Sequence, residues 1–512
     1  MKKTLTIILS VSLCVIISGC TARGIGSNAK EAVYGKSFKI SELNDNSPLS
    51  EVGFACTEIE PSDEEVRKMT DEVIEQILGK KGLSAIIKRG DKVVIKVNMV
   101  GPGYGSVNKK GRGIISDPRI VKHVAEKVRE IIGFENGADL KIIDALFYSE
   151  KNPSSKSEKT SFYYARLERK NNTAHYDSDG DGFLDGSSKA ELVNLDSIDE
   201  KNRFFTTINE PLIGDTKVYL PKFLRAKEQA GGESDYCDVY IGIPVLKSHA
   251  FTGITGALKL HYGLSPGIFK RTRHHGYGWG TGDVRLLLNY LCAMNRSRKF
   301  DLVIMDALTG NRKGPLNTSM NLGGYDMPTD YILTNAVLCS KDSVAIDTVE
   351  TLLAGYNPDS VPLLESAFRD GIGINKPSHI DLKGYEKFHS HKIRLSEFNR
   401  NKYPFEDGWG NARTHKDFSK PQNVNLKIKS AGGNIYLIDY SAEEKANGDS
   451  GLSRIELFIN GERYSHTAQK CESGTFTVNL KKFSGREIRL RIAAWDNVLN
   501  CSLSEEIKIR VK

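Results

Sequence analysis

The chain has 512 residues, of which 39% are hydrophobic and 27% charged, and its formal net charge at pH 7 is +8. These proportions are ordinary for a globular protein, and the length predicts two or three domains. The charge is mild and is not gathered in a basic block or interleaved with aromatic residues, so nucleic acid is not an expected partner.

The first 20 residues read as a lipoprotein signal peptide. Two lysines precede an apolar run over 5–17, which is too short to span a bilayer of roughly 30 Å. The sequence Ile-Ser-Gly-Cys at 17–20 then resembles the bacterial lipobox, in which the cysteine is acylated and becomes the mature N-terminus. We therefore expect palmitate-type lipid on Cys20 to anchor the protein to the cell membrane or the outer membrane, facing away from the cytoplasm. The alternative is an ordinary cleaved signal with an incidental cysteine.

A polar tether is expected over 21–50, followed by an α/β domain. Residues 92–98 form an apolar run typical of a buried strand, and a helix that begins at Asp117-Pro118 leads to a second strand over 140–145. Strand, helix and strand at this spacing make a βαβ unit. The sequence therefore predicts a largely parallel sheet with flanking helices.

The same alternation returns after a polar insertion over 150–235 and completes a domain that spans 51–385. Further strands are expected over 239–244, 301–306 and 336–339, and further helices over 282–294 and 343–353. A second set of strands thus extends the predicted sheet.

A polar linker over 386–420 is expected to separate this domain from an all-β module over 421–512. Short runs of alternating hydrophobicity, with an Asn-Gly turn pair at 460–461, predict a small β-sandwich that looks like an immunoglobulin-like module. Cys471 and Cys501 both fall in this module. They can form a disulfide only if their Cα atoms approach, which the spacing does not decide.

The segment 243–259 has the densest group of polar side chains directly after a predicted strand. The carboxyl end of a strand is where open α/β sheets bind ligands. Cationic and hydroxyl donors beside exposed backbone N–H groups suit a carboxylate or a phosphate. These donors are Lys247, His249, Thr252, Thr255 and Lys259. The alternative is a solvated loop whose polar side chains satisfy its own backbone.

The same segment resembles the domain of unknown function 362 family, whose members have Lys-x-His followed by Thr-Gly-x-Thr-Gly-Ala-Leu-Lys and then Tyr-Gly. The resemblance covers about 90–385 and implies an α/β fold. Further matching blocks are Lys96-Val97-Asn98, Asp306-Ala307 with Gly314-Pro315, 340–347 and 371–373. Leu260 stands where family members often have Asn. The ferredoxin-like domain of some relatives is missing, so no iron–sulfur cluster is expected.

Four further side chains complete the predicted ligand crevice, and they are Lys96, Asn98, Asp306 and Asp347. Asp306 ends a predicted strand and is placed to face the crevice. Asp347 lies inside an apolar helical pattern, where an unpaired carboxylate is costly. It is therefore either a ligand contact or the structural partner of a lysine such as Lys96 or Lys247.

A separate acidic loop over 177–185 has the spacing of a calcium-binding loop. Its oxygen ligands at positions 1, 3, 5, 7 and 9 would come from Asp177, Asp179, Asp181, the carbonyl of Phe183, and Asp185. Gly182 occupies position 6, but Ser188 stands where a bidentate Glu is usual. We expect Ca²⁺ to staple the insertion here, and the alternative is a plain acidic turn.

The predicted function is that of an exported lipoprotein whose core binds a small anionic ligand. His249 and Asp347 are the candidates for acid–base catalysis, since the pKa of a free histidine lies near neutrality. No phosphate loop, nucleophile elbow or dinucleotide fingerprint names a reaction. The alternative is a non-catalytic cell-surface binding protein.

Overall fold

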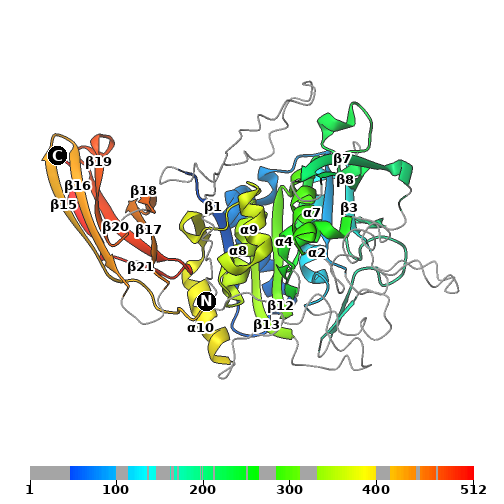
Figure 1. Ribbon diagram of the computed structural model, residues 1–512, viewed down its shortest axis with the longest axis horizontal. Coiled ribbons are helices and arrows are strands. Elements are labelled where there is room, and N and C mark those ends of the chain that lie inside the picture. The colour runs from blue at the N-terminus through cyan, green and yellow to red at the C-terminus, as the bar shows by residue number, and fades with distance from the viewer. Residues whose placement is uncertain are drawn as a thin grey trace, which may run out of the picture. The chain divides into compact units, whose positions relative to one another are not determined.

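The computed structural model describes most of the chain after residue 46 (Figure 1). The described residues are 47–99, 113–134, 138–145, 162, 166–169, 172–195, 198, 200–210, 214–249, 252–264, 284–311, 331–398, 415–444, 450–468 and 471–512. The predicted signal peptide, Cys20 and most of the predicted tether lie outside these residues. Within the described part, no helix is long and apolar enough to cross a membrane.

A ten-stranded sheet forms the centre of the α/β core. The strands of its main path are, in spatial order, β14 (Ile380–Lys383), β1 (Ser50–Cys56), β13 (Tyr331–Ser340), β12 (Leu302–Asn311), β9 (Val239–Ile243), β2 (Lys92–Val97), β3 (Asp139–Asp144) and β6 (Glu191–Asn194). From β12 to β6 all neighbours are parallel, whereas β13 is antiparallel to both β12 and β1. β10 (Val245–His249) pairs with β12 and with the short β11 (Gly253–Ile254). The predicted, largely parallel sheet is confirmed.

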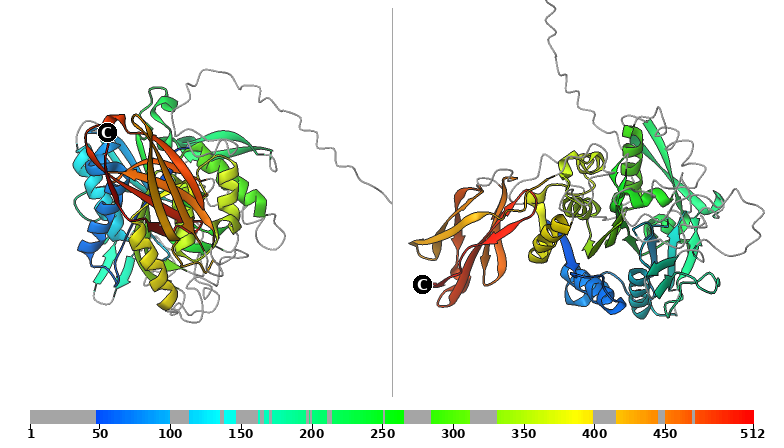
Figure 2. Two further views of the ribbon diagram at one scale, coloured as in Figure 1. Left: turned by 90° about the vertical axis from the view of Figure 1, so that its left-hand side faces the viewer. Right: turned by 90° about the horizontal axis from the view of Figure 1, so that it is seen from below.

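Helices cover both faces of this sheet, as two views show (Figures 1 and 2). The helices are α1 (Asp63–Leu78), α2 (Pro118–Ile132), α4 (Gly256–Leu260), α7 (Val284–Ser297), α8 (Ser343–Leu353), α9 (Pro362–Arg369) and α10 (Tyr385–Phe398). Successive side chains of a strand point to opposite faces. Within β2, Val93 and Ile95 belong to the apolar cluster of α1 and α2, while Val94 belongs to that of α7, α8 and α9. Both faces are therefore buried, as a parallel sheet requires.

Capping residues set the start of the two helices on the first face. The Ser62 hydroxyl accepts from the Glu65 N–H at the start of α1, and the Glu65 carboxylate accepts in return from the Ser62 N–H. Asp117 caps α2, with Pro118 at its first position, where the sequence predicted a helix to begin. Each such cap contributes about 1 kcal/mol.

The insertion and the linker are more structured than their composition suggests. The insertion supplies the edge strand β6 and two hairpins, formed by β4 (Arg166–Arg169) with β5 (Asn172–His175) and by β7 (Arg203–Glu210) with β8 (Gly214–Pro221). Residues at the start of the expected linker form α10, in which Phe388 and Leu395 are buried. Their apolar spacing is sparse, and burial beside β1 gives the helix its stability.

The C-terminal module consists of two antiparallel sheets, and the predicted β-sandwich is confirmed. One sheet contains β15 (Gln422–Gly432), β16 (Ile435–Glu443) and β19 (Ser473–Asn479). The other contains β17 (Leu452–Ile459), β18 (Glu462–Thr467), β20 (Glu487–Asp496), β21 (Cys501–Leu503) and β22 (Ile507–Arg510). Asn460 and Gly461 both have positive φ and turn the chain between β17 and β18, as expected of this pair. Cys471 and Cys501 are both buried and are not joined by a disulfide.

Candidate functional site

The carboxyl ends of β2 and β10 bring together the residues that the sequence placed in a crevice. Lys96 is in β2, Asn98 follows it directly, and Lys247 is in β10. The Lys247 Nζ donates to the Asn98 Oδ1 at 3.2 Å, although the two residues are 149 positions apart in the chain. The structure therefore places this part of the predicted set at one edge of the sheet.

Lys96 forms a buried ion pair that the sequence analysis missed. Its Nζ lies 2.6 Å from the Asp144 carboxylate and also donates to the Val97 carbonyl at 2.8 Å. Asp144 is the last residue of β3, so the argument that singled out Asp306 at a strand end applies to it equally. A Cβ built on Gly263 would collide with both charged groups, because this glycine closes over the pair. This lack of space explains why the motif has a glycine after Tyr262.

Lys247 is also fully buried, but among the described residues its Nζ donates only to neutral oxygens. Besides Asn98, it donates to the Ile114 carbonyl at 2.8 Å. Burial, and next the positive charge of Lys259, lowers the pKa of Lys247 to about 7. At neutral pH this side chain therefore exchanges between ammonium and amine, and each form is substantially populated.

Glu350 is a second residue that the sequence analysis missed. Its Oε1 accepts from the Lys247 backbone N–H at 3.2 Å, while its Oε2 is buried and has no hydrogen-bond partner in the described part of the chain. Burial, together with the neighbouring Asp347, raises the pKa of Glu350 well above the ordinary value and so favours the neutral carboxyl. It lies three residues after Asp347 on α8, and the same reasoning about acids in apolar helices would have found it.

Asp347 holds the glycine turn before α4. Its two carboxylate oxygens accept from the backbone N–H groups of Ala257 at 2.6 Å and Leu258 at 2.9 Å. Gly256 has φ +48°, and a Cβ there would collide with this carboxylate. Burial raises the pKa of Asp347 to about 8 in spite of these donors. The pairing with Lys96 or Lys247 that we considered from the sequence is not what the structure shows, since Lys96 pairs with Asp144.

The hydroxyl and imidazole donors of the segment turn inward. The Thr252 hydroxyl donates to the Ile254 carbonyl at 2.6 Å, and the Thr255 hydroxyl lies 3.5 Å from the Ser248 carbonyl. His249 ends β10 and is only 5% exposed. Lys259 lies with its Nζ 4.9 Å from the centre of the Tyr262 ring. The threonines thus shape the turn, and the lysines carry its charge.

Asp306 belongs to a neighbouring group of charges. Its carboxylate accepts from the backbone N–H of Asp117 at 2.8 Å and of Leu308 at 3.0 Å. Asp117 in turn binds the Arg119 guanidinium at 2.7 Å. Burial, and next the charge of Asp117, raises the pKa of Asp306 to about 7. This carboxyl fixes the start of α2 beside the lysines.

Three of the four predicted calcium-loop carboxylates converge. One oxygen each of Asp177, Asp179 and Asp185 lies within 4.8 Å of the others. Asp181 lies outside this group, and its Oδ1 accepts from the Phe183 N–H at 2.8 Å. Phe183 also forms a β-bridge with Glu191, the first residue of the edge strand β6. The loop geometry thus provides a partial set of hard oxygen ligands, which suit Ca²⁺.

Comparison with known families supports the resemblance seen in the sequence. Residues 207–351 match the model of the family described as domain of unknown function (DUF362). This stretch runs from β7 into α8 and includes the segment from Lys247 to Lys259. Because the function of this family is described as unknown, the match assigns no activity to this chain.

No curated protein matches the chain. Among solved structures, the spore cortex lytic enzyme SleM of Clostridium perfringens is 18% identical over 18% of this chain and 28% of that chain, with a TM-score of 0.14. Fibronectin(III)-like modules of CbhA from Clostridium thermocellum are 18% identical over 20% and 51%, with a TM-score of 0.15. The M60 catalytic domain of ZmpC from Clostridium perfringens, in complex with the sialyl T antigen, is 19% identical over 28% and 25%, with a TM-score of 0.13. TM-scores this low carry no argument.

Proposed function

We propose that the α/β core binds a small anionic molecule, a carboxylate or a phosphate, at the carboxyl ends of β2 and β10, with Lys247 as its principal contact. One observation carries this proposal. The Lys247 ammonium is fully buried and, within the part of the chain that the structure describes, donates only to neutral oxygens, whereas Lys96 at the same sheet edge has a carboxylate of its own. A buried charge without a counter-ion is costly, and an anionic ligand would supply one.

The charges around Lys247 favour the same kind of ligand. Lys259 and Lys96 add positive potential, while the negative charge of Asp144 is committed to Lys96. Burial and the neighbouring Asp347 raise the pKa of Glu350, which favours the neutral form of this carboxyl. In its neutral form Glu350 can donate a hydrogen bond from its unpartnered oxygen to an anion.

Proton transfer is the chemistry that this site would support. With the pKa of Lys247 lowered to about 7 by burial, its amine form can accept a proton near neutrality. The raised pKa of Glu350 makes that carboxyl a proton donor. We keep His249 as a further candidate for acid–base work, because it ends the same strand as Lys247.

The test is a thermal-shift panel of small carboxylates and phosphates on the parent chain, Lys247→Met and His249→Ala. Lys392→Met is the matched control, since Lys392 is also fully buried and its Nζ donates to the neutral oxygens of Val498 and Asn500, but the nearby charges of Asp496 and Asp417 act on it. We expect at least one anion to raise the melting temperature of the parent and of the control but not of Lys247→Met. Equal shifts in all variants would refute the site.

For the acidic loop we propose a structural Ca²⁺ held by Asp177, Asp179 and Asp185, with the Phe183 carbonyl as a further ligand. The convergence of three carboxylates supports this proposal. Calorimetry with CaCl₂ on the parent and on Asp177→Asn measures the affinity for Ca²⁺. The control is Asp359→Asn, which changes an exposed carboxylate in the turn before α9. Binding that survives Asp177→Asn unchanged would contradict the loop as the site.

We also propose that the chain is exported and anchored by lipid on Cys20, which the signal-like N-terminus supports. Intact-mass analysis of membrane fractions tests it. A mature N-terminus at Cys20 with two or three acyl chains is expected, and Cys20→Ser should leave the membrane fraction. An unmodified Cys20 would overturn the anchor.

A further inference from the structure

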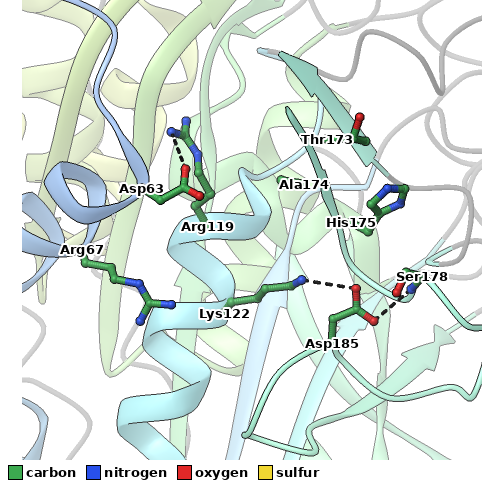
Figure 3. Close-up of a pocket in the computed structure, with 9 residues that line it drawn as sticks. All are labelled: Asp63, Arg67, Arg119, Lys122, Thr173, Ala174, His175, Ser178 and Asp185. Atoms are coloured by element: carbon green, nitrogen blue, oxygen red, sulfur yellow. Dashed lines mark hydrogen bonds and ion pairs between the residues drawn. The ribbon is translucent and has the colours of Figure 1, made fainter. Parts of the chain in front are cut away.

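A polar cavity of about 270 Å³ lies beside the acidic loop and is lined by none of the residues around Lys247 (Figure 3). Its walls come from α1, α2, the strand β5 and the loop. The lining residues are Asp63, Arg67, Arg119, Lys122, Thr173, Ala174, His175, Ser178 and Asp185. The volume is near the lower end of the range for small-ligand pockets, and the lining is dominated by groups that carry charge or donate hydrogen bonds.

Three cationic side chains reach this cavity from the first two turns of two helices. Arg67 comes from α1, and Arg119 and Lys122 come from α2. The N-terminal ends of helices carry positive partial charge, which adds to that of the side chains. Two carboxylates, Asp63 and Asp185, also line the cavity, so its charged lining combines three cationic and two anionic side chains.

The three cationic side chains differ in the number and strength of the contacts that they make with the protein. The Arg119 guanidinium binds the Asp117 carboxylate and the Pro61 carbonyl, and it is committed to the start of α2. Arg67 is paired with Glu126 at 2.9 Å and is about half exposed. Among the described residues, the Lys122 ammonium has one partner, the Asp185 carboxylate at 3.3 Å (Figure 3). Lys122 is therefore the cation that can change partner at least cost.

Asp185 connects the cavity with the acidic loop. Its Oδ2 pairs with Lys122, its Oδ1 accepts from the Ser178 N–H at 2.9 Å, and it is one of the three converging carboxylates. A cation in the loop would compete with Lys122 for this carboxylate. Once Asp185 turns to the loop cation, the Lys122 ammonium is left to face the cavity.

From this arrangement we infer that the cavity binds a tetrahedral oxyanion, a sulfate or phosphate ester, through Lys122 and Arg67, and that Ca²⁺ in the acidic loop strengthens its binding by drawing Asp185 away. The calcium dependence rests on the calcium loop proposed above, whereas the anion site itself does not. Coupling between the two sites is reciprocal, so the anion must tighten Ca²⁺ binding by the same factor.

The experiment is calorimetric titration of the whole chain with inorganic sulfate, at constant ionic strength, in EDTA and in saturating CaCl₂. We expect the dissociation constant for sulfate to fall at least about fivefold in calcium, the lower end of typical coupling between sites. The converse titration of CaCl₂ with and without sulfate should give the same factor.

Two substitutions separate the parts of the inference. Lys122→Ala should lose sulfate binding, while Lys127→Ala, an exposed lysine of the same helix outside the cavity, should keep it. Asp185→Asn removes the competitor of the anion, so sulfate should bind at least about fivefold more tightly without calcium and no longer respond to it. Thermal unfolding checks that each variant is folded.

Sulfate affinity that is the same in Lys122→Ala as in the parent overturns the anion site. If Asp185→Asn tightens sulfate binding but CaCl₂ has no effect on the parent, the anion site stands and the calcium loop fails. If CaCl₂ binds and sulfate affinity does not change, the calcium loop stands and the exchange of Asp185 between partners is wrong.

Discussion

Two lysines at the same edge of the core sheet are both completely buried, yet they are stabilised in different ways. Lys96 at the end of β2 has the Asp144 carboxylate at 2.6 Å, whereas Lys247 in β10 has two neutral oxygens and a neighbouring lysine. The first is a closed ion pair with every charge compensated. The second is a cation to which no described carboxylate is hydrogen-bonded, and on our proposal this difference separates a structural lysine from one that contacts a ligand.

The largest loss of stability is expected when the buried ion pair between Lys96 and Asp144 is broken. Asp144→Asn leaves the Lys96 ammonium buried without a counter-ion, and we expect unfolding free energy to fall by about 3–5 kcal/mol. Urea denaturation measures this loss. The matched control is Asp139→Asn at the other end of β3, whose ion pair with Lys141 is partly exposed and should contribute at most about 1 kcal/mol. A loss at Asp144 no larger than at Asp139 would mean that the buried pair is not stabilising.

A smaller effect is expected from the glycine that closes over the same pair. Gly263→Ala adds a Cβ where the Lys96 Nζ and an Asp144 oxygen lie, and overpacking of this kind costs about 1–3 kcal/mol. Denaturation of the single and double variants forms a cycle. In the Asp144→Asn background the penalty should change, because contacting residues are coupled. Strict additivity would argue against the contact.

Much of this edge of the sheet could be predicted from the sequence, but the partners of its buried charged side chains could not. Strand ends, helix starts and the segment around Lys247 followed from local patterns that the chain repeats. Asp144 and Glu350 were missed because each was hidden in an apolar run, and their partners lie 48 and 103 positions away. Asp347 was correctly singled out as a buried acid. Its role in holding the turn at Gly256 depends on a backbone contact across 90 positions, which no spacing reveals.

The contribution of Lys247 to the stability of the protein should depend on pH. The unfolded chain binds a proton at Lys247 with a pKa near 10.4, while burial lowers the pKa in the folded chain to about 7. Between these values the unfolded state binds more protons, so the contribution of Lys247 to stability rises with pH, by at most about 1.4 kcal/mol per pH unit. Below pH 7 the penalty is constant.

Lys247→Met removes this dependence. The free-energy difference between parent and variant, measured by denaturation from pH 7 to 10, should move in favour of the parent as pH rises. Taking the difference at each pH cancels the similar slope from Lys392, whose pKa burial lowers to about 8. A difference that is flat with pH would mean that Lys247 has a counter-ion after all.

The smallest effect on stability is expected from Glu350→Gln. This substitution tests most directly whether Lys247 differs from Lys96 in lacking a counter-ion. Because burial and Asp347 raise the pKa of Glu350, the neutral carboxyl is favoured, and glutamine preserves both that neutral form and the acceptor for the Lys247 N–H. The raised pKa means that the folded state binds the extra proton, so the stability from Glu350 is complete below about pH 4.3 and is lost as pH rises toward the folded pKa. At pH 7 we expect the unfolding free energy to change by less than about 1 kcal/mol. If Glu350 were instead the hidden counter-ion of Lys247, the substitution would leave a buried cation unpaired and cost about 3–5 kcal/mol, and the contrast between the two lysines would disappear.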